Sequence, residues 1–286
     1  MQYRTLGDVR VSAIGLGGMP MSIEGRPDRD TSISAIHASL DAGVTLIDTA
    51  DAYHLHADEV GHNENLIADA LDAYGPHDDV LIATKGGHLR PGDGSWTLDG
   101  SPEHLRQACD ASLKRLRVDA IGLYQFHRPD PRVPFAESVG TLAELLDTGK
   151  IRMAGVSNAD PAQIRQAQDI LGGRLVSVQN QFSPAFRSSE PELELCDRLG
   201  IAFLPWGPLG GISRAAELGS RFAAFAEVGT AHGASPQQVC LAWLLAKSPV
   251  VIPIPGSTRP ATAQSSAAAA DLALASDELA RLDAAG

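Results

Sequence analysis

Residues 44–53 read VTLIDTADAY, a short apolar run that ends in polar residues. An amphipathic stretch follows at 63–73, and this order is typical of a strand followed by a crossover helix. The alternation repeats along the chain and predicts strands at 13–16, 45–47, 80–84, 121–126, 153–156, 176–179, 202–204 and 250–252. It predicts helices at 31–42, 63–73, 102–116, 135–148, 161–170, 191–199, 215–232 with 236–246, and 259–270.

A repeat of this kind favours an α/β fold in which a parallel sheet closes into a (β/α)8 TIM barrel. A doubly wound open sheet is the structural alternative. Residues 3–6 and 9–11 flank Gly7-Asp8 and predict an N-terminal β-hairpin that caps the bottom of the barrel. We expect residues 1–286 to form a single domain, because barrels of about 200–250 residues are routinely one domain. The alanine-rich end, 267–286, is expected to be helical.

The composition argues against several kinds of partner. The formal charge is 23 − 35 = −12, whereas nucleic acid or an anionic membrane surface would favour a basic patch. The cysteines, Cys109, Cys196 and Cys240, form no C-x-x-C pair, so neither a disulfide framework nor a zinc site is indicated. The chain shows no signal-like start and no apolar run of membrane-spanning length. We therefore expect a cytoplasmic protein with no nucleic-acid, membrane or metal partner.

Polar residues follow almost every predicted strand. The carboxyl ends of barrel strands share one rim, and the chemistry of such folds lies there. Each residue alone could be a turn cap or a solvated charge, but so many at one rim are hard to explain by packing. They are Asp48 with Tyr53, Lys85, His127, Ser157 with Asn158, Gln179, the segment 205–211 and the segment 255–259.

Several segments match one known family in order and spacing. They are IDTA at 47–50 with Tyr53, Lys85 at a strand end, LYQFHRP at 123–129, GVSN at 155–158, QN at 179–180, PLG at 208–210 and IPGS at 254–257. In these segments, and over nearly its whole length, the chain resembles the aldo-keto reductase family. The resemblance implies an NAD(P)H-dependent oxidoreductase that reduces an aldehyde or ketone, or oxidises the alcohol, by hydride transfer.

The resemblance implies a catalytic tetrad of Asp48, Tyr53, Lys85 and His127. Elementary chemistry agrees, because hydride delivery builds negative charge on the carbonyl oxygen and Tyr53 could meet it as a general acid. The unperturbed pKa of tyrosine is about 10, and an ammonium group at Lys85 would lower it. Asp48 would hold Lys85 in place, and His127 would bind and orient the carbonyl oxygen or help to relay the proton.

The resemblance also implies a cofactor site, with NADPH preferred and NAD possible. Trp206 would stack on the nicotinamide ring, where the family more often has tyrosine, and Arg259 would meet the adenosine 2′-phosphate. The family's usual second cation becomes Thr262, and its Glu-Asn pair becomes Ser265-Ser266. The expected cofactor-binding residues are Gly18, Met19, Asp48, Ser157, Asn158, Gln179, Trp206, Gly207, Pro208, Leu209, Gly211, Gly256, Ser257, Thr258, Arg259 and Gln264.

The substrate is expected to be a small carbonyl compound or alcohol. The glycine-rich loop 86–100 lies at the expected mouth of the pocket, and Phe186 is a further possible wall. The expected pocket residues are Met19, Tyr53, Trp96, His127, Phe182 and Trp206.

Some residues of the sequence would also suit functions other than carbonyl reduction. A barrel metallohydrolase could use His54 and His56, but the later strands end in Ser157 and Gln179 rather than in metal ligands. A Rossmann enzyme could use the glycines at 15–18, but Pro20 replaces the last fingerprint glycine, so we interpret them as a tight turn under the nicotinamide. A barrel that binds the cofactor as a sensor, without turnover, stays open as the alternative function.

Overall fold

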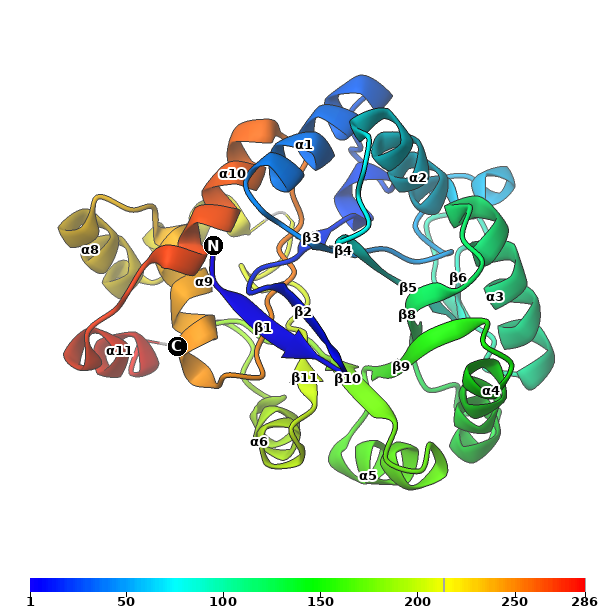
Figure 1. Cartoon of the computed structure of the whole chain (residues 1–286). Coiled ribbons are helices and arrows are strands. Elements are labelled where there is room, and N and C mark those ends of the chain that lie inside the picture. The colour runs from blue at the N-terminus through cyan, green and yellow to red at the C-terminus, as the bar shows by residue number, and fades with distance from the viewer. Residues whose placement is uncertain (213, 286) are drawn as a thin grey trace.

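A computed structural model describes residues 1–212 and 214–285 and shows a ring of helices around parallel strands (Figure 1). The strands form one sheet in the order β11-β10-β9-β8-β5-β4-β3. All neighbouring pairs in it are parallel. The bounds are β3 (Leu16–Gly17), β4 (Leu46–Asp48), β5 (Leu81–Gly86), β8 (Ile121–Phe126), β9 (Ile151–Ser157), β10 (Leu175–Gln179) and β11 (Ala202–Phe203).

The segment 250–256 closes this sheet into a barrel. Val251 bridges to Phe203 on β11, and Gly256 bridges to Gly17 on β3. The expected strand at 250–252 is wrong in detail, because this segment forms isolated bridges only. The prolines at 253 and 255 have no N–H group to donate to a ladder. The ring is nevertheless complete, and the predicted (β/α)8 barrel is confirmed.

Gly17 explains how the closing segment fits. A Cβ atom at this position would lie 2.8 Å from the carbonyl oxygen of Ile254, so a side chain would push the two strands apart. Gly17 therefore belongs to the barrel seam, and the interpretation of these glycines as a tight turn is wrong at this position.

Helices cover the outside of the barrel (Figure 1). Several begin with a serine or aspartate cap followed by proline, as at Ser101, Asp160 and Ser235. The α-helices are α1 (Arg29–Asp41), α2 (His62–Tyr74), α3 (Pro102–Leu116), α4 (Phe135–Asp147), α5 (Pro161–Ile170), α6 (Glu190–Leu199), α7 (Leu218–Arg221), α8 (Ala223–His232), α9 (Pro236–Lys247), α10 (Pro260–Ala268) and α11 (Ser276–Asp283). Single 3-10 turns are η1 (Met19–Met21), η2 (Ala57–Glu59), η3 (Ala215–Glu217) and η4 (Ala269–Asp271).

Two expected helices are interrupted. The stretch 215–232 divides into η3, α7 and α8, because Phe222 between α7 and α8 has φ −132° and ψ 83°, which is not helical. The end of the chain is not one helix either: the backbone leaves the helical region at Leu272, and α11 begins at Ser276. Gly286 lies outside the described residues. Among the described residues, no helix is both long enough and apolar enough to cross a membrane.

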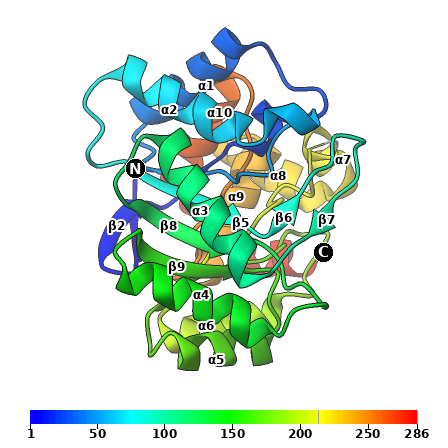
Figure 2. The ribbon, with the colours of Figure 1, turned by 90° about the vertical axis from the view of Figure 1, so that its right-hand side faces the viewer.

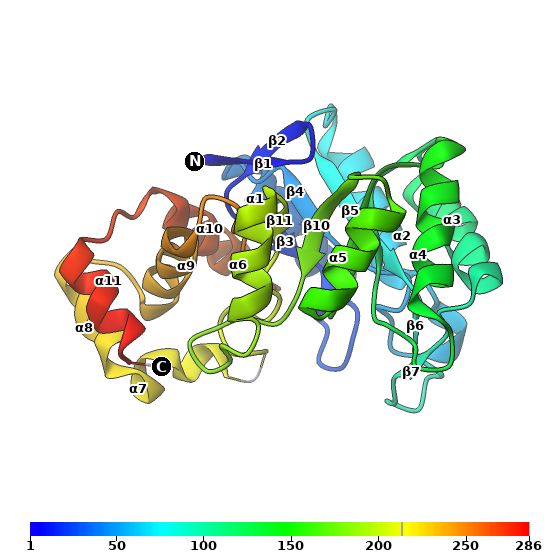
Figure 3. The ribbon, with the colours of Figure 1, turned by 90° about the horizontal axis from the view of Figure 1, so that it is seen from below.

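Two hairpins lie at opposite ends of the barrel (Figures 2 and 3). The expected N-terminal hairpin, β1 (Tyr3–Leu6) with β2 (Val9–Ser12), buries Leu6 and Val11 against the barrel bottom. A second hairpin, β6 (His88–Leu89) with β7 (Thr97–Leu98), was not expected from the sequence. It arises within the loop that follows β5 and stands over the functional rim.

Candidate active site

The carboxyl ends of the strands open into a cavity of about 1260 Å³. Small-molecule sites in proteins commonly have volumes of about 300–1,000 Å³, so this cavity has room for more than one small ligand. Its lining combines the strand ends with residues from 206–212, 215–216 and 254–266. The expected residues Met19, Trp96 and Trp206 all line it.

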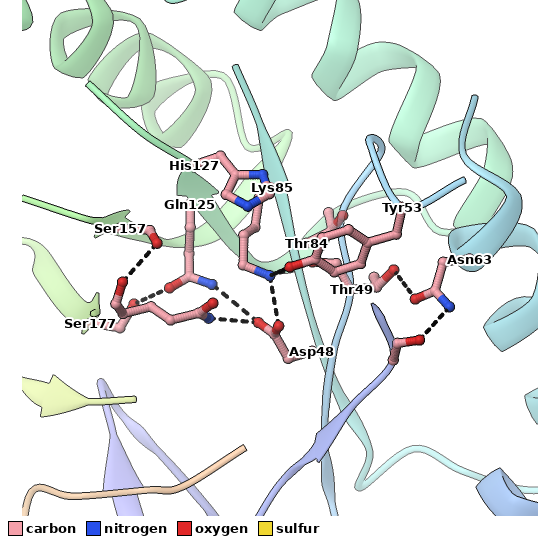
Figure 4. A network of polar contacts seen from close by, with 12 residues as sticks. Asp48, Thr49, Tyr53, Asn63, Thr84, Lys85, Gln125, His127, Ser157 and Ser177 are labelled. Atoms are coloured by element: carbon pink, nitrogen blue, oxygen red, sulfur yellow. Dashed lines mark hydrogen bonds and ion pairs between the residues drawn. The ribbon is translucent and has the colours of Figure 1, made fainter. Parts of the chain in front are cut away.

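Lys85 lies at the centre of the polar network beneath the cavity (Figure 4). Its side chain is fully buried at the end of β5, and its Nζ donates to Asp48 Oδ1 at 2.6 Å, to the carbonyl oxygen of Thr49 at 2.7 Å and to Tyr53 Oη at 3.1 Å. These acceptors match the three protons of an ammonium group. Burial alone would lower the pKa of Lys85, but the charge of Asp48 and the hydrogen bonds to Asp48 and Tyr53 outweigh it and raise the pKa, so Lys85 stays protonated.

Asp48 anchors this arrangement from the end of β4. Its second carboxylate oxygen, Oδ2, accepts a hydrogen bond from Gln179 Nε2 at 2.7 Å and a longer one from Gln125 Nε2 at 3.5 Å. Burial raises the pKa of Asp48, while Lys85 and the glutamine amides oppose that rise. The carboxylate therefore fixes Lys85 and is itself held by β8 and β10.

Tyr53 reaches the network from the loop after β4 and lines the cavity. Burial raises the pKa of its phenol, and the positive charge of Lys85 opposes that rise. Lys85 does lower the pKa of Tyr53, as expected, but burial raises that pKa by more, so the net shift is upward. A buried phenol beside an ammonium group can donate a proton and share the resulting charge.

His127 completes the expected group of four at the end of β8. Its ring lies 5.8 Å from the Tyr53 ring, centroid to centroid, in an edge-on arrangement. Burial, together with the charge of Lys85, lowers the pKa of His127 well below its usual value, so the imidazole is neutral. The structure thus brings all four expected catalytic residues together at one point of the rim.

The residues expected at the nicotinamide form a second cluster beside the first. Ser157 Oγ donates to the carbonyl oxygen of Gln179 at 2.7 Å, and Asn158 Nδ2 donates to the carbonyl oxygen of His127 at 3.0 Å. Trp206 Nε1 donates to Asn158 Oδ1 at 3.2 Å. Asn158 has φ 57°, a left-handed conformation that asparagine tolerates better than most residues. Asn158 therefore ties the ends of β8 and β9 to Trp206.

The far end of the cavity is suited to an anionic group. Helix α10 begins there with Arg259 as its N-cap residue, and no side chain caps the helix. Its first turn contributes Ala261 and Thr262 to the lining, with Ser257 just before it. Uncapped N–H groups and the helix dipole favour phosphate. The structure pairs Arg259 with no carboxylate of the described residues, so its guanidinium is free to add to that preference.

The backbone at 207–211 forms another wall. Gly207 and Gly211 line the cavity with φ 59° and 102°, and a Cβ atom at Gly211 would meet nothing. Pro208 and Leu209 line it as well. A ligand backbone can therefore lie close to this segment. Together with the α10 end, these features fit a dinucleotide cofactor.

Some expected residues do not line the cavity. Phe182 is fully buried in the core, where it stacks on Trp243 with ring centroids 6.1 Å apart, and Phe186 is also absent from the lining. Gln264 is exposed on α10, because the helical period turns Thr262 and Ser265 inward instead. Gly18 lies below the surface against Asn63. The placements of Phe182, Gln264 and Gly18 at the cavity are therefore wrong. The remaining expected cofactor residues all line it.

Several cavity residues were missed from the sequence. His88 packs between Trp96 and His127, with ring centroids 4.6 and 4.8 Å away. Burial, with the charge of Arg128, lowers the pKa of His88 to about 4. Of His88 and Arg128, the sequence pointed only to Arg128, which directly follows His127 in the family-matching segment LYQFHRP. His88 depends on the β6–β7 hairpin, which has no strong pattern of its own.

A buried acidic pair lies behind Tyr53. Glu64 accepts from Arg115 Nε at 2.5 Å and from Thr84 Oγ1 at 2.6 Å, whereas Oδ1 of Asp51 has no partner. Burial, reinforced by the charge of Glu64, raises the pKa of Asp51 to about 8. His54, a metal ligand under the alternative hydrolase hypothesis, instead contacts the carbonyl oxygen of His56 through its Nδ1. Within 1–212 and 214–285, no three histidine, cysteine or acidic side chains are grouped to hold a metal ion.

Comparison with known proteins agrees with this geometry. The model of the Aldo/keto reductase family matches residues 13–286. An uncharacterized oxidoreductase of Schizosaccharomyces pombe is 35% identical over 97% of this chain and 88% of its own length. A 6-dehydroglucose reductase of Novosphingobium aromaticivorans is 35% identical over 91% and 87%. A Klebsiella pneumoniae aldo/keto reductase, solved with NADP and acetate, superposes with a TM-score of 0.82 at 27% identity over 99% and 94% of the two chains. The chain is therefore an oxidoreductase and belongs to the aldo/keto reductase family.

Proposed function

We propose that this protein is an NAD(P)H-dependent carbonyl reductase that converts an aldehyde or ketone to the alcohol, with Tyr53 as the general acid. One observation carries the proposal: Nζ of Lys85 contacts both Asp48 and Tyr53 Oη while the neutral ring of His127 lies beside the phenol. A proton donor, a group that stabilises its conjugate base and a carbonyl-binding group are thus assembled at one rim.

The cavity residues would hold the cofactor along its length. The phosphate-rich end fits the start of α10 and Arg259, and the segment 207–211 would cover the middle. Asn158, Ser157 and the ring of Trp206 would position the nicotinamide. NADP, held by the Klebsiella relative, is our first choice for this chain. When bound, the reduced cofactor supplies a hydride to the substrate carbonyl.

The chain's own residues then manage the proton and the charge. His127, being neutral, donates a hydrogen bond to the carbonyl oxygen and orients it. Tyr53 Oη donates its proton to that oxygen as negative charge builds on it. Nζ of Lys85 stabilises the phenolate left behind, and Asp48 keeps the ammonium group in place. Burial of Asp48 and Lys85 keeps water from weakening these contacts.

Replacement of Tyr53 tests the proposal. Tyr53→Phe preserves the ring but removes the proton donor, so we expect unchanged cofactor affinity and a fall in kcat of about 10²–10⁴-fold. The measurement is NADPH oxidation with 4-nitrobenzaldehyde as an activated substrate. Tyr74→Phe is a matched control, because Tyr74 is exposed at the surface and its hydroxyl donates to Asp41, away from the cavity.

The results separate this proposal from its alternative. Near-normal kcat in Tyr53→Phe would remove Tyr53 from the role of general acid. Wild-type protein that binds the cofactor tightly but oxidises none of it with any activated aldehyde would favour a cofactor-binding sensor instead.

A further inference from the structure

Arg128 lines the cavity directly after His127 in the chain. Its guanidinium is about half buried, and burial lowers the pKa of Arg128 with no neighbouring acid to offset it. The charge of Arg128 reaches the rim, because it contributes to lowering the pKa of both His88 and His127. A cation therefore lies close to the point where the substrate carbonyl is expected to bind.

Three other arginines around the rim already have carboxylate partners, and Arg259 lies at the far end of the cavity, where the cofactor phosphate is proposed to bind. Arg90 contacts Glu24 and the carbonyl oxygen of His54, Arg26 contacts Glu59, and Arg132 contacts Asp130. Within 1–212 and 214–285, Arg128 makes no hydrogen bond or ion pair. A half-buried charge without a partner is costly, and in a cavity that cost is recovered when a ligand supplies the counter-charge.

We propose that Arg128 binds a carboxylate on the substrate, so that the preferred substrates are carbonyl compounds with a carboxylate at the end remote from the reacting group. This inference deepens the proposed reduction and depends on it. The planar guanidinium of arginine matches a carboxylate with two parallel hydrogen bonds.

A carboxylate fits better than a phosphate monoester. Arg128 offers a single free fork, and Arg90, whose guanidinium lies over Trp96, is already ion-paired with Glu24. Glu24, the ion-pair partner of Arg90, itself lines the cavity, so the described residues offer a phosphate dianion no second free cation beside Arg128. Trp96 stands beside the same end, with the guanidinium of Arg90 4.7 Å from its ring centroid, and supplies a flat surface for the body of the substrate.

The test compares two aldehydes that differ mainly in charge: 4-carboxybenzaldehyde and methyl 4-formylbenzoate. We expect wild type to show the higher kcat/KM with the carboxylate. Arg128→Gln should lower the carboxylate-to-ester ratio of kcat/KM by about ten- to a hundred-fold, the range of a charged hydrogen bond. The change should lie mainly in KM, because the contact is remote from the reacting atoms.

Two further variants sharpen the result. Arg128→Lys keeps the positive charge but loses the planar, two-pronged guanidinium. Its carboxylate-to-ester ratio of kcat/KM should therefore fall between those of wild type and Arg128→Gln. Arg152→Gln makes the same chemical change at an exposed residue of β9 outside the cavity, and its ratio should equal that of wild type. An unchanged ratio in Arg128→Gln, or an equal loss in Arg152→Gln, would overturn the proposal. A greater kcat/KM for 4-formylphenyl phosphate than for 4-carboxybenzaldehyde would overturn the choice of carboxylate.

A binding measurement separates this inference from the reaction itself. Protein saturated with NADPH is titrated with 4-carboxybenzyl alcohol and with its methyl ester, a combination that cannot react. Tighter binding of the carboxylate in wild type, lost in Arg128→Gln, supports the anion site even if neither aldehyde is reduced. Equal affinity for the two alcohols contradicts it, whether or not the protein proves to be a reductase.

Discussion

At the scale of single residues, the site depends on one buried ammonium group. Lys85 has no exposed surface, and each of its protons has an acceptor. The same charge opposes the burial that raises the pKa of Tyr53 and helps to keep His127 neutral. One cation thus influences both the proposed acid and the proposed carbonyl-binding group.

Removal of this charge should change how alcohol oxidation depends on pH. Lys85 lowers the pKa of Tyr53 relative to a buried phenol alone, so Lys85→Met should raise that pKa further. Oxidation requires the phenolate, so the limb of the profile that rises with pH should move to higher pH. The measurement is kcat/KM for alcohol oxidation against pH, with circular dichroism to verify folding.

The exposed Lys114 provides the control for that experiment. Lys114→Met makes the same substitution on the outer face of α3 and should leave the profile in place. A folded Lys85→Met enzyme with the wild-type profile would show that Lys85 does not tune Tyr53.

At the scale of elements, the start of α10 combines an uncapped N-terminus with a position at the cavity. Helices α1, α3, α5 and α9 carry side-chain caps at Asp28, Ser101, Asp160 and Ser235. Helix α10 begins with the uncapped Arg259 at the cavity. This uncapped start faces the far end of the cavity, and free N–H groups at a helix start are what phosphate binding requires.

Arg259 should therefore set the choice between cofactors. Arg259→Ala should weaken NADPH binding and leave NADH binding nearly unchanged, because NADH has no 2′-phosphate. A charged hydrogen bond contributes about 1.5–3 kcal/mol, or roughly ten- to a hundred-fold. We expect the lower end, because Thr262 stands where a second cation would strengthen the contact. Fluorescence titration with both cofactors measures this, and equal losses for NADPH and NADH would exclude a phosphate contact.

At the scale of the whole molecule, the acidic pair behind the site affects stability. Asp51 is buried with one unpartnered carboxylate oxygen beside the ion pair of Glu64 and Arg115. Its pKa of about 8 in the folded protein exceeds the usual value near 4 of an unfolded chain. The folded state therefore binds a proton that the unfolded state releases, and stability should fall as the pH rises from about 4 to about 8.

Asp51→Asn should flatten that part of the pH dependence, because asparagine mimics the protonated acid and cannot ionise. We expect the variant to gain stability relative to wild type at pH 8 but not at pH 5, measured by urea unfolding. Asp119→Asn, at an exposed acid, is the control. A difference between Asp51→Asn and wild type that is the same at both pH values would contradict the assigned ionisation. A single cooperative transition in these curves would also support the expectation of one domain.

Local chemistry explains what the sequence alone determined. Apolar runs that end in polar residues located the strands and the rim, and serine–proline and aspartate–proline pairs marked helix starts because their effects act within one turn. The strand-end pattern placed Asp48, Tyr53, Lys85 and His127 at one rim, and the family resemblance singled them out as a tetrad. Phe182 and Gln264 could not be placed, because their burial depends on which way a loop and a helix face turn in space.

Tertiary structure decided the rest. The barrel closes through a proline-rich segment, and its bridge to β3 needs glycine at position 17, where a Cβ atom would lie 2.8 Å from the carbonyl oxygen of Ile254. The network at Lys85 joins residues far apart in sequence, since Gln179 reaches Asp48 across 131 positions. Arg128 is left without a partner because the acidic residues near the rim pair with other arginines, and such pairing depends on tertiary structure. A sequence records which groups are available, but long-range packing determines which of them find partners and which stay open to a ligand.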